Sequence, residues 1–123
     1  MVQMLPLRDR EFLAELNQKE GTDAGLAYCL HDGGEITGYV LYDIAPEEGR
    51  IRAVNAPDEP SFDGLVRSVF SSLFDASVNR AVFDEGVDSA RLERLGFTAP
   101  GQRVTPSIED VLYLCKHCKG HCS

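Results

Sequence analysis

The segment spanning residues 26–55 constrains the fold more than any other part of this 123-residue chain. Three runs rich in β-branched and aromatic residues, at 26–30, 35–44 and 50–55, alternate with short segments of Gly, Pro and Asp. This composition is typical of strands joined by tight turns. Such short connections join only antiparallel neighbours, because parallel strands need a long crossover. The sequence therefore predicts a three-stranded antiparallel meander around which the rest of the chain is organised.

Both faces of this meander carry apolar side chains. In the second predicted strand Val40 and Tyr42 share one face, whereas Tyr39 and Leu41 share the other, because successive side chains of a strand point in opposite directions. A sheet that is apolar on both sides must be covered on both sides. We therefore expect helices in two layers, one against each face.

The clearest helical pattern follows the meander, at residues 62–74. Its large apolar residues recur at i, i+3, i+4, i+7, i+8, i+11 and i+12, which is the spacing of one face of an amphipathic helix. Ser61 is expected to cap this helix. Because burial of each such side chain contributes roughly 1.5–3 kcal/mol, we expect it to be the main core helix. The apolar residues are Phe62, Leu65, Val66, Val69, Phe70, Leu73 and Phe74.

Shorter patterns complete the predicted order of elements. We expect an edge strand at 2–7, a helix at 10–20, a strand at 79–84, a helix at 90–95 and a last strand at 110–115. The strand at 79–84 follows a helical crossover, so it should lie parallel to the third strand of the meander. The sequence thus predicts an α+β fold of three α/β/α layers with a mixed, mostly antiparallel central sheet.

Charge and hydropathy narrow the range of partners. The chain has 20 acidic and 12 basic residues, for a net charge of -8. Such a surface repels phosphates and anionic lipid, so we expect neither nucleic acid nor a membrane as partner. No apolar run is long enough to span a bilayer and the N-terminus lacks the pattern of a secretory signal, which predicts a cytoplasmic protein.

The exposed edge of the strand expected at 111–115 could pair with a second subunit, and the sequence leaves the oligomeric state open.

The order of the predicted elements resembles that of the GNAT N-acetyltransferase superfamily from about residue 2 to residue 115. Three local features carry the resemblance. They are the Gly-Tyr-Val-Leu run at 38–41, the long amphipathic helix after the meander, and the segment 91–97, which ends in Leu-Gly-Phe. The resemblance implies an acyl-CoA N-acyltransferase-like fold for residues 1–114, acetyl-CoA as cofactor, and a small-molecule or peptide amine as acceptor.

The same resemblance implies where a cofactor would bind. In the superfamily the pyrophosphate rests on backbone N–H groups of a Gly-rich loop that opens the core helix, where unpaired donors and the helix dipole favour an anion. The rest of the cofactor lies in a cleft between two strands that splay apart. The residues that the resemblance places along this path are Val54, Asn55, Ser61, Gly64 and Phe83.

The segment at the start of the core helix departs from the superfamily pattern, since only Gly64 matches it. Asp58, Glu59 and Asp63 place three carboxylates where a dianionic pyrophosphate would bind, and Pro60 removes a backbone donor. Like charges repel more strongly where the site is drier. This segment is therefore the main argument against acetyl-CoA as cofactor.

The catalytic groups of the superfamily have no direct counterparts here, so no catalytic residue is assigned. Many members carry a Tyr shortly before the Leu-Gly-Phe ending, where this chain has Leu92. Several carry a Glu in the third meander strand, and residues 50–55 contain no carboxylate. Tyr28, Tyr39 or Tyr42 could substitute, or could pack in the sheet with the hydroxyl at its rim.

A Cys/His-rich tail at 115–123 lies outside the superfamily pattern. Its cysteines and histidines are the ligands that tetrahedral zinc prefers, and Cys-x-x-Cys is a common half-site. Copper(I) or an iron–sulfur cluster would also accept thiolates. His117 is the alternative to His121. The predicted metal ligands are Cys115, Cys118, His121 and Cys122.

Two functions from different classes follow. The first is an acyl-CoA-dependent N-acetyltransferase, in which a neutral amine attacks the thioester and positioning provides most of the rate enhancement. The second is a non-catalytic protein with the acetyltransferase fold, whose tail binds a metal or responds to redox state. Calorimetric titration with acetyl-CoA separates the two, because only the enzyme needs the cofactor.

Overall fold

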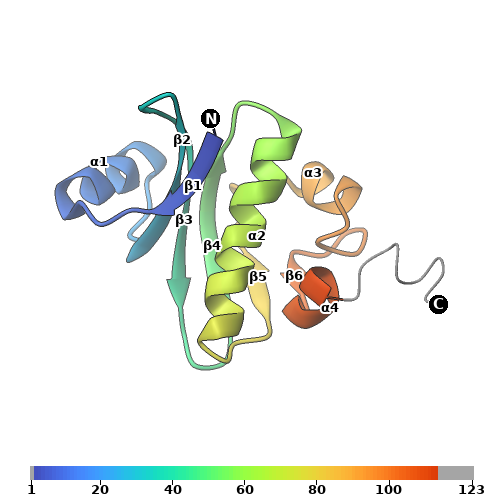
Figure 1. Ribbon diagram of the computed structural model, residues 1–123. Helices are drawn as coiled ribbons and strands as arrows, with labels where there is room; N and C mark the ends of the chain where they lie inside the picture. The colour runs from blue at the N-terminus through green and yellow to red at the C-terminus, as the bar shows by residue number, and fades with distance from the viewer. Residues whose placement is uncertain (1, 114–123) are drawn as a thin grey trace.

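The computed structural model describes residues 2–113, and within that range it contains one sheet with helices on both faces (Figure 1). The elements in chain order are β1 (Val2–Pro6), α1 (Arg10–Glu20), β2 (Leu26–Asp32), β3 (Glu35–Ile44), β4 (Gly49–Asn55), α2 (Glu59–Asp75), β5 (Ala81–Phe83), α3 (Ser89–Arg94), β6 (Val104–Thr105) and α4 (Ile108–Tyr113). Among the helices in this range, none is both long and apolar enough to cross a membrane.

The sheet has six strands in the order β1-β2-β3-β4-β5-β6. All neighbours are antiparallel except β4 and β5, which pair in parallel. The predicted meander is confirmed as β2, β3 and β4, with Leu26 opposite Tyr42 and Tyr39 opposite Asn55. The predicted parallel pairing of β5 with β4 is also confirmed, and α2 forms the crossover between them.

Two hydrophobic cores lie on opposite faces of the sheet, as the apolar pattern on both faces predicts. α1 covers one face and α2 covers the other (Figure 1). Val40 and Tyr42 belong to the α2-side core, whereas Tyr39 and Leu41 belong to the α1-side core. The apolar face of α2 is buried as predicted. Its buried residues are Phe62, Leu65, Val66, Val69, Phe70 and Leu73.

The start of α2 differs from the prediction. The sequence suggests Ser61 as the cap, but the N-cap is Asp58, whose carboxylate accepts a hydrogen bond from the Ser61 N–H at 2.8 Å. Pro60 lies in the first turn, where its missing N–H leaves no intrahelical bond unmade. The helix therefore begins at Glu59, two residues before the expected cap.

The predicted last strand at 110–115 is wrong over the described residues, because they form α4. Ile108 and Val111 are spaced for a helix and pack against the α2-side core. Asn79 holds the start of α4: its backbone carbonyl accepts from the Ile108 N–H at 2.9 Å, and its side-chain oxygen accepts from the next N–H at 2.7 Å. A short apolar run fits either a strand or a buried helix, and here contact with α2 decides.

Strand β4 extends beyond its partner β5. The pairing covers residues 49–51 and 81–83, and it ends where the Asp84 N–H donates to the Ile51 carbonyl at 2.9 Å. Residues 52–55 of β4 therefore have no strand beside them on that side of the described sheet. The backbone of β4 is therefore unpaired on this side from Arg52 to Asn55 in the described sheet.

Candidate functional site

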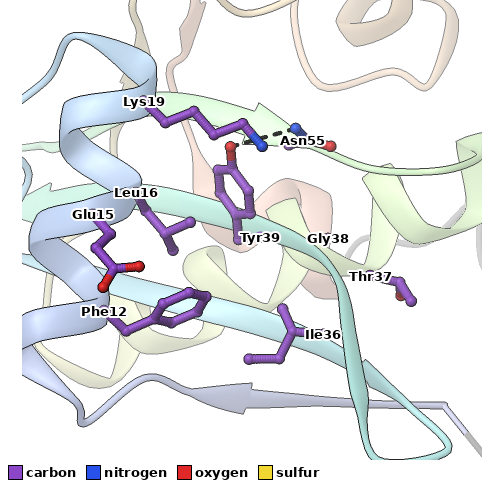
Figure 2. Close-up of a pocket in the computed structure, with 9 residues that line it drawn as sticks. All are labelled: Phe12, Glu15, Leu16, Lys19, Ile36, Thr37, Gly38, Tyr39 and Asn55. Carbon is purple, nitrogen blue, oxygen red and sulfur yellow. Dashed lines mark hydrogen bonds between the residues drawn. The ribbon is translucent and has the colours of Figure 1, made fainter.

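Two cavities lie on the α1 face of the sheet, and each includes one residue of the unpaired segment 52–55. The first, the helix cavity, has a volume of about 340 Å³ and lies between α1 and β3 (Figure 2). Its walls are formed by Phe12, Glu15, Leu16 and Lys19 of α1, by Ile36, Thr37, Gly38 and Tyr39 of β3, and by Asn55 at the end of β4.

Tyr39 connects the helix cavity to the end of α1. Its side chain is buried, and its hydroxyl donates a hydrogen bond to the Glu20 carboxylate and accepts one from Asn55 Nδ2 at 3.4 Å (Figure 2 shows the Asn55 contact). The Lys19 ammonium lies 5.8 Å from the centroid of the Tyr39 ring. Burial, together with the hydrogen bond to Glu20, raises the pKa of Tyr39 to about 12. At neutral pH this residue is therefore a protonated hydroxyl.

Arg52 is at the centre of the second cavity, the strand cavity, which has a volume of about 460 Å³ beside the end of β5. A β-bulge in the pairing of β3 with β4 leaves Arg52 as an extra residue, and bulges redirect side chains. The Arg52 guanidinium contacts the carboxylates of Asp84 and Asp23 at 2.8 Å and of Asp43 at 3.0 Å. Asp84 also accepts from Arg50 Nε at 2.5 Å. These ion pairs join three segments of the chain to β4.

The surroundings of the strand cavity are acidic. Glu20 and Glu85 line it together with Asp84, and two further aspartates pair with Arg52. Five carboxylates thus stand against the guanidiniums of Arg50 and Arg52 and that of Arg103, which donates to the Asp84 and Glu85 carbonyls, and this leaves an excess of two negative charges. A cleft lined by one sign of charge concentrates the field and attracts the opposite charge. This cavity therefore suits a cationic group such as a protonated amine.

The first turn of α2 does not fit a pyrophosphate. The Ser61 N–H is bonded to the Asp58 carboxylate at 2.8 Å, and Pro60 has no N–H to offer. Hydrogen bonds from Ser61 lower the pKa of Asp58, so this carboxylate is charged at neutral pH. Glu59 accepts from Arg94 Nη2 at 2.7 Å, and this bond lowers the pKa of Glu59. Two of the groups that could hold a dianion, the Ser61 N–H and the Arg94 guanidinium, are thus already bonded to carboxylates of the chain.

Arg91 is the exception near this turn, because its Nε is buried and has no hydrogen-bond partner within the described residues. Its guanidinium lies over the Phe62 ring, 5.2 Å from the centroid, and its Nε is 3.8 Å from the Glu59 carboxylate. The two contacts hold the side chain between an aromatic face and a carboxylate. One unused donor beside two carboxylates does not make a phosphate site.

Gly64, the one residue of this segment that matches the superfamily loop, packs against β1. A Cβ at this position would lie 2.3 Å from Met4 Cε, so the Met4 side chain packs directly against Gly64. Ser61, the other cofactor residue predicted here, uses its N–H for the Asp58 cap. Neither has a backbone group that is shown to be open to a ligand.

The other three predicted cofactor residues lie around the open end of the sheet. Val54 is partly buried and packs against the α2-side core. Asn55 is exposed and lines the helix cavity, whereas Phe83 is buried and contributes to the wall of the strand cavity. The structure does not bring the five residues into one cavity, and their role toward a cofactor stays a prediction.

The ion pairs of Arg52 are a part of the site that the sequence does not predict. Glu20 of α1, Arg52 of β4 and Asp84, the residue after β5, are far apart in the sequence, and the β-bulge and the strand register bring them together. One sign of this arrangement is present in the sequence. Asp84 is the last residue of the strand expected at 79–84, which should lie parallel to the segment that carries Arg50 and Arg52.

The predicted metal ligands Cys115, Cys118, His121 and Cys122 lie outside the described residues. Within residues 2–113, no group of three or more His, Cys, Asp or Glu side chains is arranged to hold a metal ion. Cys29 is fully buried in β2, and burial raises the pKa of its thiol, so it is not placed to be a reactive thiolate. The metal site of the tail stays a prediction.

No protein-family model and no curated protein matches this sequence. Solved structures do match. The ribosomal-protein-alanine N-acetyltransferase of Brucella melitensis biovar Abortus 2308 has a TM-score of 0.63 and 15% identity, over 81% of this chain and 94% of that one. The ribosomal-protein-S18-alanine N-acetyltransferase of Escherichia coli has a TM-score of 0.62 and 11% identity, over 87% and 94%. The Escherichia coli protein YhhK, solved bound to coenzyme A, has a TM-score of 0.56 and 11% identity, over 87% and 98%.

These similarities establish the fold. The mixed six-stranded sheet with helices on both faces is the acyl-CoA N-acyltransferase-like fold of GNAT acetyltransferases, as the sequence resemblance implies. The predicted fold class is therefore confirmed. At identities of 11–15%, the comparison shows the fold alone. The activities given in these names are those of the matched proteins.

Proposed function

We propose that this protein uses the acetyltransferase fold to bind a cationic amine and does not transfer acyl groups from coenzyme A. The observation that carries this proposal is the hydrogen bond from the Ser61 N–H to Asp58. A helix N-terminus binds phosphate through free N–H groups and its positive dipole end. Here Asp58 takes that place with a negative charge of its own, and Glu59 and Pro60 weaken the site further.

The side chains at the positions of the superfamily's catalytic groups also support a protein that does not transfer acyl groups. Leu92, where the resemblance implies a tyrosine, is fully buried in the α2-side core. Strand β4 carries Arg50 and Arg52 in place of a carboxylate, and both pair with Asp84. Tyr39, with a pKa of about 12, holds its proton more tightly than an ordinary tyrosine, which makes it a weak general acid at neutral pH.

The acidic strand cavity supports the choice of a cationic amine as the ligand. Its excess of carboxylates over guanidiniums favours a positive group next to Glu20 and Glu85, which have no ion pair within the described residues. Two structurally similar proteins are named for N-acetylation of an alanine of a ribosomal protein, so their acceptor is an amine. We infer that this chain retains an amine site and lacks the acyl donor.

Calorimetric titration with coenzyme A tests whether the protein lacks a site for the acyl donor. We expect no saturable heat from the wild-type protein at about 1 mM coenzyme A. The Asp58→Gly/Glu59→Gln double variant frees the Ser61 N–H at little cost to the helix and removes two charges, so it should bind more tightly than the wild type. Asp75→Asn is the matched control, because Asp75 is exposed at the other end of the same helix and should not matter. Micromolar binding by the wild type would overturn the proposal.

Titration with putrescine tests the amine site, with butanediol as the neutral molecule of the same length. Putrescine should bind and the diol should not, and added salt should weaken the binding. Glu85→Gln should reduce the affinity about tenfold. Glu47→Gln, at an exposed glutamate of the β3–β4 turn, is the control and should leave it unchanged. Equal binding of diamine and diol would contradict the proposal.

A second candidate is an active acyl-CoA-dependent N-acetyltransferase of an amine. It is favoured by the open edge of β4 at 52–55, and YhhK, which has the same fold, was solved bound to coenzyme A. Micromolar affinity of the wild type for acetyl-CoA, together with amine-dependent release of free thiol, would select this candidate. Its acceptor would be a small-molecule or peptide amine.

A further inference from the structure

The helix cavity is not used by the proposed function. At one end Phe12 and Leu16 of α1 lie close to Ile36 of β3 and form an apolar wall (Figure 2). Ile36 is 40% exposed, so a large apolar side chain borders open space here. The volume of about 340 Å³ lies within the range of roughly 300–1,000 Å³ that is typical of small-molecule pockets. The cavity can therefore take the apolar part of one small molecule.

Two opposite charges of α1 line the same cavity without pairing. Glu15 and Lys19 are four residues apart, in the order that favours an ion pair on a helix. Within the described residues, neither has an oppositely charged group within 4.0 Å. Lys19 instead extends toward Tyr39 and Asn55, at the end of the cavity away from Phe12 (Figure 2). The cavity thus offers one cation, one anion and an apolar wall.

We propose that the helix cavity binds a free amino acid with a large apolar or aromatic side chain. The carboxylate of the ligand contacts Lys19 and the Asn55 amide, its ammonium faces Glu15, and its side chain lies against Phe12 and Ile36. A simple carboxylate would be repelled by Glu15 and a simple amine by Lys19, so a zwitterion is the complementary class. This site is separate from the strand cavity and does not depend on the proposed function.

A heteronuclear NMR titration of the full chain with L-phenylalanine tests the proposal. We expect saturable shifts of the backbone amides of residues 12–19 and 36–39, with a Kd on the order of 1 mM. Phenylpropionate lacks the ammonium, phenethylamine lacks the carboxylate and glycine lacks the apolar part. Each should bind about tenfold more weakly than L-phenylalanine. The absence of saturable shifts in these segments, or equal affinity for phenethylamine, would overturn the proposal.

Substitutions in the helix cavity distinguish a loss of amino-acid binding from a general loss of folding or of positive charge. Lys19→Met should weaken binding of L-phenylalanine about tenfold and leave that of phenethylamine unchanged or tighter. Ile36→Thr keeps a β-branched residue at an exposed strand position, so it should fold normally and also bind more weakly. Arg10→Met removes the other cation of α1, which does not line this cavity, and should bind like the wild type. Wild-type affinity in Lys19→Met would contradict the assignment.

Discussion

The Asp58 carboxylate accepts a hydrogen bond from the Ser61 backbone N–H at 2.8 Å and caps α2 from within the chain. Of the donors that a helix start offers to an anion, Pro60 supplies none and the Ser61 N–H is taken. A helix start can bind an anion through its free N–H groups or bond them to a capping side chain of the same chain. In this chain Asp58 caps the helix.

Removal of the Asp58 charge should destabilise the protein in a pH-dependent way. Asp58→Asn keeps a capping group but loses the charge, so its urea midpoint at neutral pH should lie below that of the wild type. The pKa of Asp58 is lowered in the folded state, so its charge stabilises the fold above the unfolded-state value of 3.8. This stabilisation is lost as the pH falls through the folded-state pKa. The two urea midpoints should therefore approach each other as the pH falls from about 4 through the folded-state pKa, and a difference independent of pH would contradict this role.

Ionisation of Tyr39 should destabilise the fold at high pH. The folded-state pKa of about 12 is above the ordinary value of 10.0, so the stabilisation is complete below pH 10 and is lost as the pH rises toward 12. The urea midpoint of the wild type should fall more steeply between these values than that of Tyr39→Phe. Other tyrosines contribute equally to both proteins. Parallel pH dependences would show that Tyr39 titrates normally.

Most of the fold can be predicted from the sequence, because the meander and α2 have strong periodic patterns. The apolar alternation in β3 correctly predicts two cores, and the i, i+3, i+4 pattern correctly predicts the buried face of α2. The α4 segment is the main error. Val111 and Leu112 fit a strand by composition, and only their contact with the α2-side core makes the helix the better arrangement.

Two glycines that lie near the site should respond differently to alanine. At Gly38 a Cβ would meet the backbone oxygen of Asn55 at 2.7 Å, so the strands must move and we expect a loss of about 1–3 kcal/mol in the free energy of unfolding. At Gly64 the obstacle is the end of the flexible Met4 side chain, and alanine also favours helix by about 1 kcal/mol. Urea denaturation should therefore show a smaller loss for Gly64→Ala than for Gly38→Ala, and the reverse order would contradict the packing described.

Less of the site than of the fold can be predicted from the sequence. The three carboxylates at the start of α2 are visible, but the roles of Asp58 as cap and Glu59 as partner of Arg94 depend on where the helix begins and where α3 packs. The pairing of Arg52 with Asp84 depends on a bulge that no composition reveals. Among the candidate tyrosines, only Tyr39 is shown to lie in a cavity wall.

The Cys/His-rich tail should bind zinc through Cys115, Cys118, His121 and Cys122. Metal analysis of protein purified without an affinity tag should find about one equivalent of zinc, because four thiolate and imidazole ligands complete a tetrahedral site. Cys118→Ser should remove most of it. Cys29→Ala is the control and should retain the metal, since Cys29 is buried in β2. A metal content below about a tenth of an equivalent in the wild type would exclude the site.

The backbone amide resonance of Ser61 gives the most direct test of the central claim. In an NMR titration of the wild-type protein with coenzyme A, its chemical shift should stay unchanged, because the N–H is already bonded to Asp58. In the Asp58→Gly/Glu59→Gln variant, which frees this N–H, the same resonance should move as the cofactor is added. A saturable shift of the Ser61 amide in the wild type at micromolar coenzyme A would contradict the proposed function. It would favour the second candidate, an acyl-CoA-dependent N-acetyltransferase.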